Sequence, residues 1–298
     1  MATFRSSLVV AAALLQAPDS TDGRAQLALG RAYLERLATS RALGGAQDSA
    51  SVHRMLDTAD QAFTRAIRAF GAPGSDAPGD TARVLRVRLW SERARFAWER
   101  GGLALGPDSW GPLPTDLRLS PVLEELGENL LRACPPGGVL LTAGDADSYA
   151  VWYERFVRGL RPDVLVVPLS VWRSDSAFRV RAARDLRLGR RGAGGEWLRA
   201  LVERRLVCVS MVFAHPPETA GATWRVRPLV WVAGPHLRGD PVSPRDFVFA
   251  ALKMALDDHD PWAEPAVALY GRAARETPPL CAALATFLVS GEIAECRR

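Results

Sequence analysis

The sequence predicts an α/β protein with a helical N-terminal half and a small, mostly parallel sheet in its C-terminal half, followed by C-terminal helices. Up to about residue 102, apolar residues recur at spacings of three and four, which is the period of amphipathic helices. After residue 120, short apolar runs alternate with helical stretches, as in parallel sheets whose two faces are covered. Residues 103–119 are rich in Gly and Pro and predict a linker between the halves.

The composition is that of a folded protein without a nucleic-acid partner. The 298 residues are 48% hydrophobic and 24% charged, as in globular domains. The net charge is +5, but the arginines are spread along the chain and alternate with acidic residues. No dense basic run interleaved with aromatic residues is present, which argues against nucleic-acid binding.

Residues 1–17 have the layout of a short signal peptide. Arg5 precedes an apolar stretch from Leu8 to Leu15, and polar residues follow. The stretch is too short to span a bilayer, and no other segment is long enough, so we expect no transmembrane span in the mature chain. Leu15 stands where a cleavage site prefers a small residue, and an ordinary first helix is the alternative. A true signal predicts a periplasmic or otherwise extracytoplasmic protein; without one, the protein is expected in the cytoplasm.

Residues 18–102 form the predicted helical, repeat-like domain, with breaks at GGAQDS and GAPGSDAPGD. A pattern of small and large residues on the first two helices resembles the tetratricopeptide repeat, and its positions are Leu29, Gly30, Tyr33, Ala59, Phe63, Ala66 and Pro73. The resemblance implies a protein partner. An extra stretch separates these helices and no second copy follows, so a helical hairpin or three-helix bundle is an equal alternative, because a single repeat cannot bury its own face.

Residues 120–298 form the predicted α/β domain. Ser120 followed by Pro121 marks a helix start, and PPGG ends that helix. The strand VLLTA, a helix from about Ser148 to Gly159 and the strand DVLVVPL come next. Strands are also expected in LVCVSMVF and RPLVWVAG, and helices in SAFRVRAARDL, after Gly195 and in three C-terminal segments.

The four cysteines form no CxxC pair, and no histidine stands near one at zinc-ligand spacing, which argues against a structural metal site. Cys208 lies in an apolar strand and is expected to be a buried small hydrophobe. Cys281 and Cys296 are expected to pair across the last helix if the protein is exported. Cys134 directly precedes the turn PPGG.

The segment TAGDADSY follows the first strand and holds the main candidate site. In an open parallel sheet, ligands bind beyond the carboxyl ends of the strands. Asp145 and Asp147 can supply oxygen ligands to Mg²⁺ or Mn²⁺, and such a cation can hold a diphosphate. The alternative is structural: Asp147 or Ser148 caps a helix beginning near Tyr149, and Asp145 interacts favourably with the helix dipole.

Motifs of the common enzyme classes are missing from the sequence. It contains no GxSxG elbow, no Walker loop and no HExxH. The sequence therefore favours a non-enzymatic function and leaves enzymatic activity without a motif of its own.

The region around the acidic segment resembles the soluble C-terminal region of a bacterial family of multi-pass membrane proteins. That family is of unknown function, glycosyltransferase-like and related to protein O-mannosyltransferases. The resemblance covers about residues 120–235. The matching positions are Cys134, Pro135, Gly144, Asp145, Asp147, Trp152, Tyr153, Gly159, Arg161, Pro162, Asp163, Leu169 and Ser170.

The resemblance implies a binding or scaffold role more than catalysis. In transferases of that type the catalytic acid is expected in the membrane half, which has no counterpart in this chain. Ala146, Pro168 and Arg173 stand where the family commonly has Asn, which implies a less polar pocket. We therefore expect a non-catalytic binding or scaffold protein that works with a protein partner or a membrane complex.

The alternative is an enzyme, or an accessory protein, in sugar or glycan transfer that uses the acidic segment and a divalent cation. The candidate metal ligands are Asp145 and Asp147. The candidate ligand-binding residues are Gly144, Asp145, Asp147, Ser148, Trp152 and Tyr153.

Overall fold

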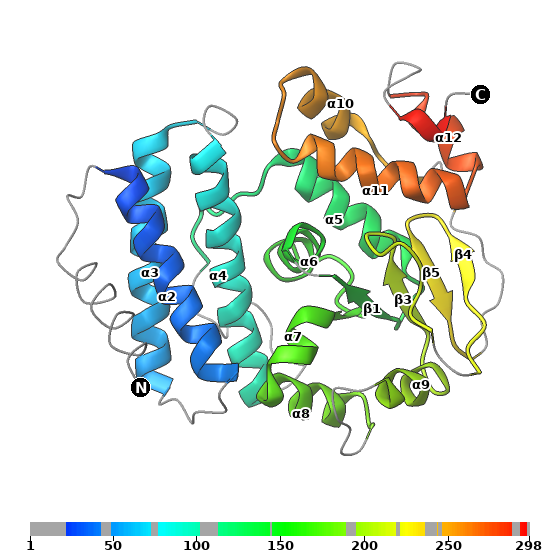
Figure 1. Cartoon of the computed structure of the whole chain (residues 1–298), viewed down its shortest axis with the longest axis horizontal. Coiled ribbons are helices and arrows are strands. Elements are labelled where there is room, and N and C mark those ends of the chain that lie inside the picture. The colour runs from blue at the N-terminus through cyan, green and yellow to red at the C-terminus, as the bar shows by residue number, and fades with distance from the viewer. Residues whose placement is uncertain are drawn as a thin grey trace, which may run out of the picture. The chain divides into compact units, whose positions relative to one another are not determined.

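A computed structural model describes residues 22–42, 49–72, 77–101, 113–143, 145–188, 195–218, 221–235, 243, 246–287 and 293–296 (Figure 1). The chain divides into two compact units, residues 1–90 and residues 91–298. The division falls within one long helix, ahead of the linker predicted at 103–119. The predicted signal peptide lies outside the described residues.

The helical unit contains helix α2 (Gly23–Ala42), helix α3 (Ser49–Phe70) and the first part of helix α4 (Ala77–Gly101). α2 packs closely on α3, because Gly30 presents no side chain to the buried ring of Phe63. A Cβ atom at Gly30 would lie 2.4 Å from that ring. Asp60 of α3 accepts hydrogen bonds from Arg86 and Trp90 of α4, at 2.9 and 3.0 Å. The predicted three helices are confirmed.

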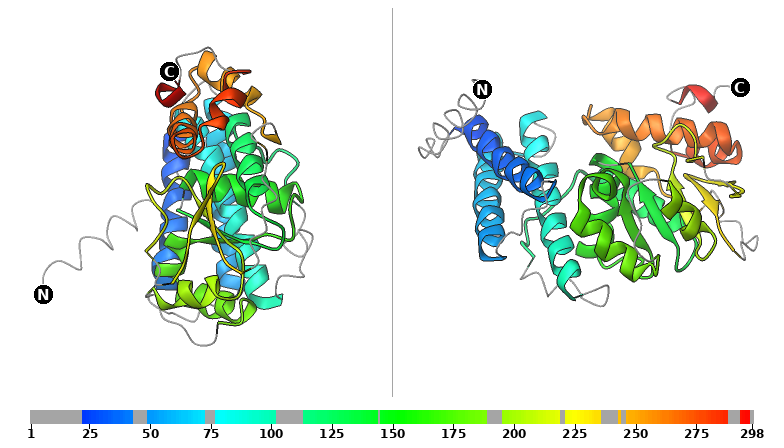
Figure 2. Two further views of the ribbon diagram at one scale, coloured as in Figure 1. Left: turned by 90° about the vertical axis from the view of Figure 1, so that its right-hand side faces the viewer. Right: turned by 60° about the horizontal axis from the view of Figure 1, so that its bottom comes forward.

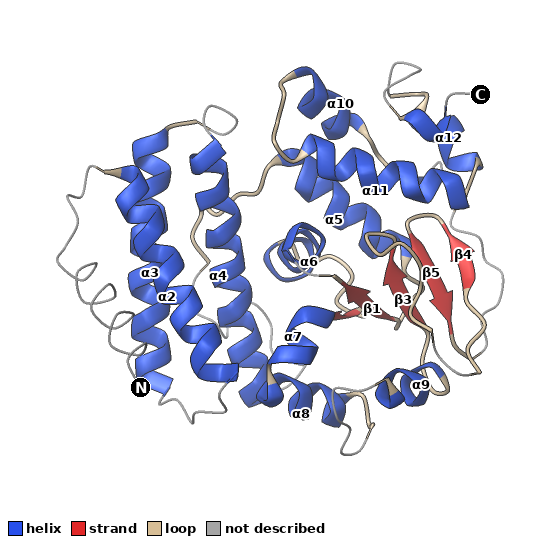
Figure 3. Cartoon of the chain, in the orientation of Figure 1, coloured by secondary structure: helices blue, strands red, loops and turns tan. Residues whose placement is uncertain are grey.

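The α/β unit is built on a five-stranded sheet with the order β2-β1-β3-β5-β4 (Figure 3). Its strands are β1 (Val139–Thr142), β2 (Leu165–Pro168), β3 (Val207–Ser210), β4 (Arg225–Arg227) and β5 (Val230–Ala233). β1 pairs in parallel with β2 and with β3, whereas β5 pairs antiparallel with β3 and β4. β1, β2, β3 and β5 are the predicted strands, and their burial reflects helices on both faces.

Helices lie on both sides of this sheet (Figures 1 and 2). On one side are α5 (Pro121–Ala133), α6 (Asp145–Trp152), α10 (Ala250–Asp257) and α11 (Ala263–Glu276). On the other are α8 (Ser176–Asp185) and α9 (Glu196–Val202). The remaining elements are α7 (Leu169–Ser174), α12 (Pro279–Leu284), the π-helical turn η2 (Tyr153–Val157) and the 3-10 turn η4 (Ala294–Cys296). Within the described residues, no helix is both long and apolar enough to cross a membrane.

Two disulfides link parts of the α/β unit. Cys134, at the end of α5, pairs with Cys208 of β3. Cys208 is buried as predicted, but it is half of a disulfide and not a small hydrophobe. The two cysteines are 74 residues apart in the sequence. They are brought together by the pairing of β1 with β3, which cannot be deduced from the spacing of the cysteines. Gly138 makes room, because a Cβ atom there would lie 2.8 Å from the Cys134 sulfur. The predicted pairing of Cys281 with Cys296 is confirmed.

Two elements of the α/β unit were not predicted, and one helix begins earlier than predicted. β4 has the sequence Arg-Val-Arg, which is too short and too charged to predict a strand. α7 follows β2 without a turn residue between them. The helix predicted from Ser148 begins at Asp145 and becomes the π-helical turn η2 after Trp152. This earlier start changes the position of both candidate aspartates.

Candidate functional site

The acidic segment lies where the sheet topology favours a ligand site. β1 stands between β2 and β3 and runs parallel to both. The chain therefore leaves β1 toward one neighbour and later returns to the other, which is the arrangement at a topological switch point. α6 begins at Asp145, directly beyond the carboxyl end of β1. Gly144 and the side chain of Asp145 lie outside the described residues.

The carboxylate of Asp147 is buried and bound to the protein's own backbone. Asp147 is 1% exposed, and its Oδ2 accepts a hydrogen bond from the Ala143 amide at 2.9 Å. As the third residue of α6, it reaches back across the helix start as the acidic partner of a capping box does. The prediction that Asp147 or Ser148 is the N-cap is therefore wrong in position, because the helix begins earlier.

Ser148 is also committed within the fold. Its hydroxyl lies 2.7 Å from the hydroxyl of Thr142, at the end of β1, and both residues are buried. This contact joins the first turn of α6 to the strand. Among the described residues, no group of three His, Cys, Asp or Glu side chains is arranged to hold a metal ion. The two-aspartate cation site stays a prediction that depends on Asp145.

Trp152 and Tyr153, also predicted to contact a ligand, are buried at the end of α6. They are 6% and 3% exposed. The Trp152 ring lies 4.6 Å from that of Phe156, and the Tyr153 hydroxyl donates to the Leu117 carbonyl at 3.3 Å. Burial, with the nearby carboxylate of Glu124, raises the pKa of Tyr153 to about 12. Both rings pack within the unit.

The Arg161-Pro162-Asp163 turn connects the start of β2 to the end of α5 through hydrogen bonds. Arg161 binds Asp163 with two nitrogens at 2.9 Å each, and also donates to the carbonyls of Leu131 and Cys134. Asp163 in turn accepts from the Gly137 amide at 2.9 Å. The hydrogen bond from Arg161 lowers the pKa of Asp163 to about 2. This turn holds the backbone in place.

Arg155 supports the same turn from inside. Its guanidinium donates to the carbonyls of Val164 and Pro162, at 2.6 and 2.9 Å. Burial lowers the pKa of Arg155 to about 10. Several positions of the family resemblance therefore act on the chain's own backbone, which is a structural role.

Sequence reasoning missed Glu154, a fully buried carboxylate in the π-helical turn η2. Its exposure is 0%, and neither carboxylate oxygen has a hydrogen-bond partner among the residues that the structure describes. The nearest cation is Arg158, at 3.6 Å, which also lies 3.6 Å from Glu124. Burial raises the pKa of Glu154 to about 7. Its position on the buried side of a predicted amphipathic helix was the signal that could have revealed it.

A second buried glutamate, Glu125 of α5, holds the start of α10. Its carboxylate accepts from the amides of Ala251 and Leu252 at 2.7 and 3.1 Å, where a helix N-terminus favours negative charge. Burial raises the pKa of Glu125 to about 7, although these hydrogen bonds oppose the shift. The contact is structural and joins α5 to the C-terminal helices.

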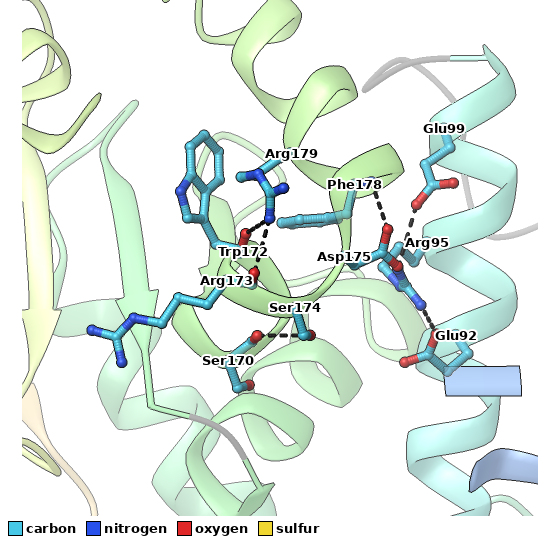
Figure 4. A network of polar contacts seen from close by, with 10 residues as sticks. All are labelled: Glu92, Arg95, Glu99, Ser170, Trp172, Arg173, Ser174, Asp175, Phe178 and Arg179. Atoms are coloured by element: carbon cyan, nitrogen blue, oxygen red, sulfur yellow. Dashed lines mark hydrogen bonds and ion pairs between the residues drawn. The ribbon is translucent and has the colours of Figure 1, made fainter. Parts of the chain in front are cut away.

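A charged cluster joins the end of α4 to the start of α8 within the α/β unit (Figure 4). Arg95 pairs with Glu92 and Asp175, and lies 3.5 Å from Glu99. Asp175 also accepts from the Phe178 amide at 3.0 Å and so caps α8. Burial alone would lower the pKa of Arg95, but the carboxylates of Glu92, Asp175 and Glu99 raise it above its usual value.

The helical unit carries a groove that sequence reasoning also missed. Its volume is about 620 Å³. One stripe of α2 and the first turns of α4 line it, with Arg24, Leu27, Ala28, Arg31, Ala32, Glu35, Ala77, Pro78 and Thr81. The i, i+3, i+4, i+7 spacing of exposed and small residues on α2 was the available signal.

Comparison with known proteins gives a short match within the α/β unit. Residues 123–176 match the family model described as TMEM260-associated domain 2. The match runs from α5 through the acidic segment and β2 to the start of α8, and it fits a family associated with membrane proteins. The match does not test the glycosyltransferase-like resemblance, and the tetratricopeptide-like region lies outside the matched residues. No curated protein and no solved structure matches the chain significantly.

Proposed function

We propose that the protein is a non-catalytic, extracytoplasmic binding or scaffold protein that works with a protein partner at a membrane complex. The observation that carries the proposal is the use of the polar side chains in the matched region. Asp147, Arg155, Arg161 and Asp163 bind the chain's own backbone. A catalytic group must be able to reach a substrate, and these groups are already committed.

The disulfides support the extracytoplasmic part of the proposal. All four cysteines are paired, and disulfides persist mainly in oxidising compartments outside the cytosol. The match to a membrane-protein-associated family model supports a partner at a membrane. The helical unit supports protein binding, because its groove offers charged side chains to a partner.

The test is cross-linking in native membranes, followed by recovery of the tagged full-length chain. We expect a reproducible protein partner. Replacing a block of exposed residues on α2 and α3 with alanine should reduce its recovery, whereas Met254→Ala, at an exposed site on α10, should not. Recovery of no partner by the wild-type chain would remove the proposal.

The alternative, an enzyme or accessory protein in sugar transfer, depends on the position of Asp145 beyond the carboxyl end of β1. Titration calorimetry with Mn²⁺ and a panel of nucleotide sugars distinguishes the two functions. We expect no binding heat from the wild-type chain. A heat of Mn²⁺ binding that Asp145→Asn abolishes would favour the transfer function instead.

A further inference from the structure

The groove of the helical unit contains basic side chains that the fold does not use. Within the described residues, Arg24, Arg31 and Glu35 make no side-chain hydrogen bond or ion pair. Two arginines of α4 in the same unit are committed, because Arg83 pairs with Asp80 and Arg86 pairs with Asp60. The free arginines stand on an exposed stripe of α2, so they are available to a ligand.

The groove floor suits a ligand with an accessible backbone and short side chains. Leu27 is 7% exposed and forms an apolar base. Ala28, Ala32 and Ala77 leave space along the walls. The hydroxyl of Thr81 donates to the Ala77 carbonyl at 2.8 Å and is satisfied internally. Attraction in this groove therefore comes from the two guanidinium groups, and the small side chains admit an extended chain.

The spacing of the arginines sets the spacing of the charges that they can bind. Arg24 and Arg31 are seven residues apart, which is about 10 Å along an α-helix. In an extended polyproline II segment, residues three apart share a face and lie about 9 Å apart. Each guanidinium can bind a carboxylate with two parallel hydrogen bonds.

We propose that this groove binds an extended acidic segment of a partner protein, with Arg24 and Arg31 holding two carboxylates three residues apart. The inference rests on the proposed binding function and names the chemistry of its partner. Glu35 lies one turn beyond Arg31 and repels a third carboxylate, so the acidic stretch ends there. The concave shape and Glu35 also disfavour an anionic membrane surface, which would need a protruding and uniformly basic face.

Fluorescence anisotropy with the full-length, disulfide-intact chain tests the inference. The probe is a short labelled peptide with aspartate at every third position of a chain rich in proline and alanine. We expect the double variant Arg24→Glu, Arg31→Glu to weaken binding roughly tenfold or more. Glu35→Lys should strengthen it several-fold. The control Arg54→Glu, Arg65→Glu changes the net charge by the same amount at two exposed sites on α3 outside the groove, and it should leave binding unchanged.

Three results would overturn the inference. One is equal binding of a matching peptide with lysine in place of aspartate. Another is an equal loss in the control Arg54→Glu, Arg65→Glu, which would indicate attraction by net charge alone. The third is binding of anionic lipid vesicles with the same dependence on Arg24 and Arg31, in place of the peptide.

The membrane cross-linking experiment separates this inference from the proposed function. If Arg24→Glu, Arg31→Glu still recovers the native partner, the binding function stands and the groove is not its site. If the wild-type chain recovers no partner, the binding function fails, whatever the peptide does.

Discussion

The two units of the chain are stabilised in different ways. The α/β unit is cross-linked by polar groups and disulfides: Arg161 ties β2 to α5, Glu125 ties α5 to α10, and Cys134 is bonded to β3. In the helical unit, apolar packing such as Gly30 on Phe63 dominates the contact of α2 with α3. The charges of its groove are left free. We therefore expect the α/β unit to be the more rigid of the two, and the groove of the helical unit to be the surface that is available to a partner.

The largest expected effect comes from removing the disulfides. Replacing Cys134 and Cys208 with alanine opens a loop of 74 residues, and replacing Cys281 and Cys296 opens one of 15. The chain-entropy model predicts losses of about 4 and about 3 kcal/mol. Hydrogen exchange measured by mass spectrometry reports each unit separately. We expect lower protection in β1 and β3 and unchanged protection in α2 and α3. Equal losses in both units would contradict the comparison.

The next effect compares two close helix contacts. A Cβ atom at Gly127 of α5 would lie 2.5 Å from the Ala150 carbonyl oxygen, whereas at Gly30 it would meet the Phe63 ring. A backbone carbonyl cannot move aside as a ring can. Alanine has a higher helix propensity than glycine, which offsets part of each clash. We therefore expect Gly127→Ala to lower the free energy of unfolding by about 3 kcal/mol and Gly30→Ala by about 1 kcal/mol.

Gly195→Ala is the control for both substitutions, because a Cβ atom there meets no atom of the described residues within 4 Å. Thermal unfolding ranks the three variants. A larger loss for Gly30→Ala than for Gly127→Ala would indicate that the α5–α6 contact is the more adaptable one.

The helices and strands could be predicted from the spacing of apolar residues in the sequence, but the roles of individual side chains could not. Apolar runs predicted β1, β2, β3 and β5 because strands that are covered on both faces are nearly uniformly apolar. The same runs could not show that β5 is antiparallel and that the sheet is mixed. The short strand β4 was not predicted, because its two arginines do not fit the apolar pattern of a strand. The Cys134–Cys208 bond and the hydrogen bond from Ala143 to Asp147 depend on register and on where a helix begins. Local sequence sets neither, so a pattern of two aspartates was compatible with both a cation site and a helix start.

A smaller effect concerns the buried charge of Glu154. Its pKa is about 7 in the folded chain and near 4.3 when unfolded, so the folded state holds the proton more tightly. Stability from this group is full below the unfolded value and is lost as pH rises toward 7. Glu154→Gln removes the titration. Between pH 4 and pH 8, we expect the free energy of unfolding of wild type to fall by about 1 to 3 kcal/mol more than that of Glu154→Gln.

Chemical unfolding at both pH values measures this difference. Glu125 titrates in the same range and is present in both proteins, so subtraction isolates Glu154. The other charged groups that face Glu154 are Glu124 and Glu128 of α5 and Arg158. A pH profile parallel to wild type would mean that Glu154 is solvated or paired at neutral pH.

The smallest effect tests the polar contacts of the helical unit. Asp60→Asn removes the charge that pairs with Arg86 but keeps an oxygen that can accept from Trp90. Since the Asp60 side chain is 20% exposed, we expect a loss of about 1 kcal/mol, and salt should reduce it. Hydrogen exchange should change in α3 and the first part of α4 while the sheet keeps its protection. A loss of protection that extends to β1 would show that the two units unfold together, and would contradict the difference in stabilisation between them.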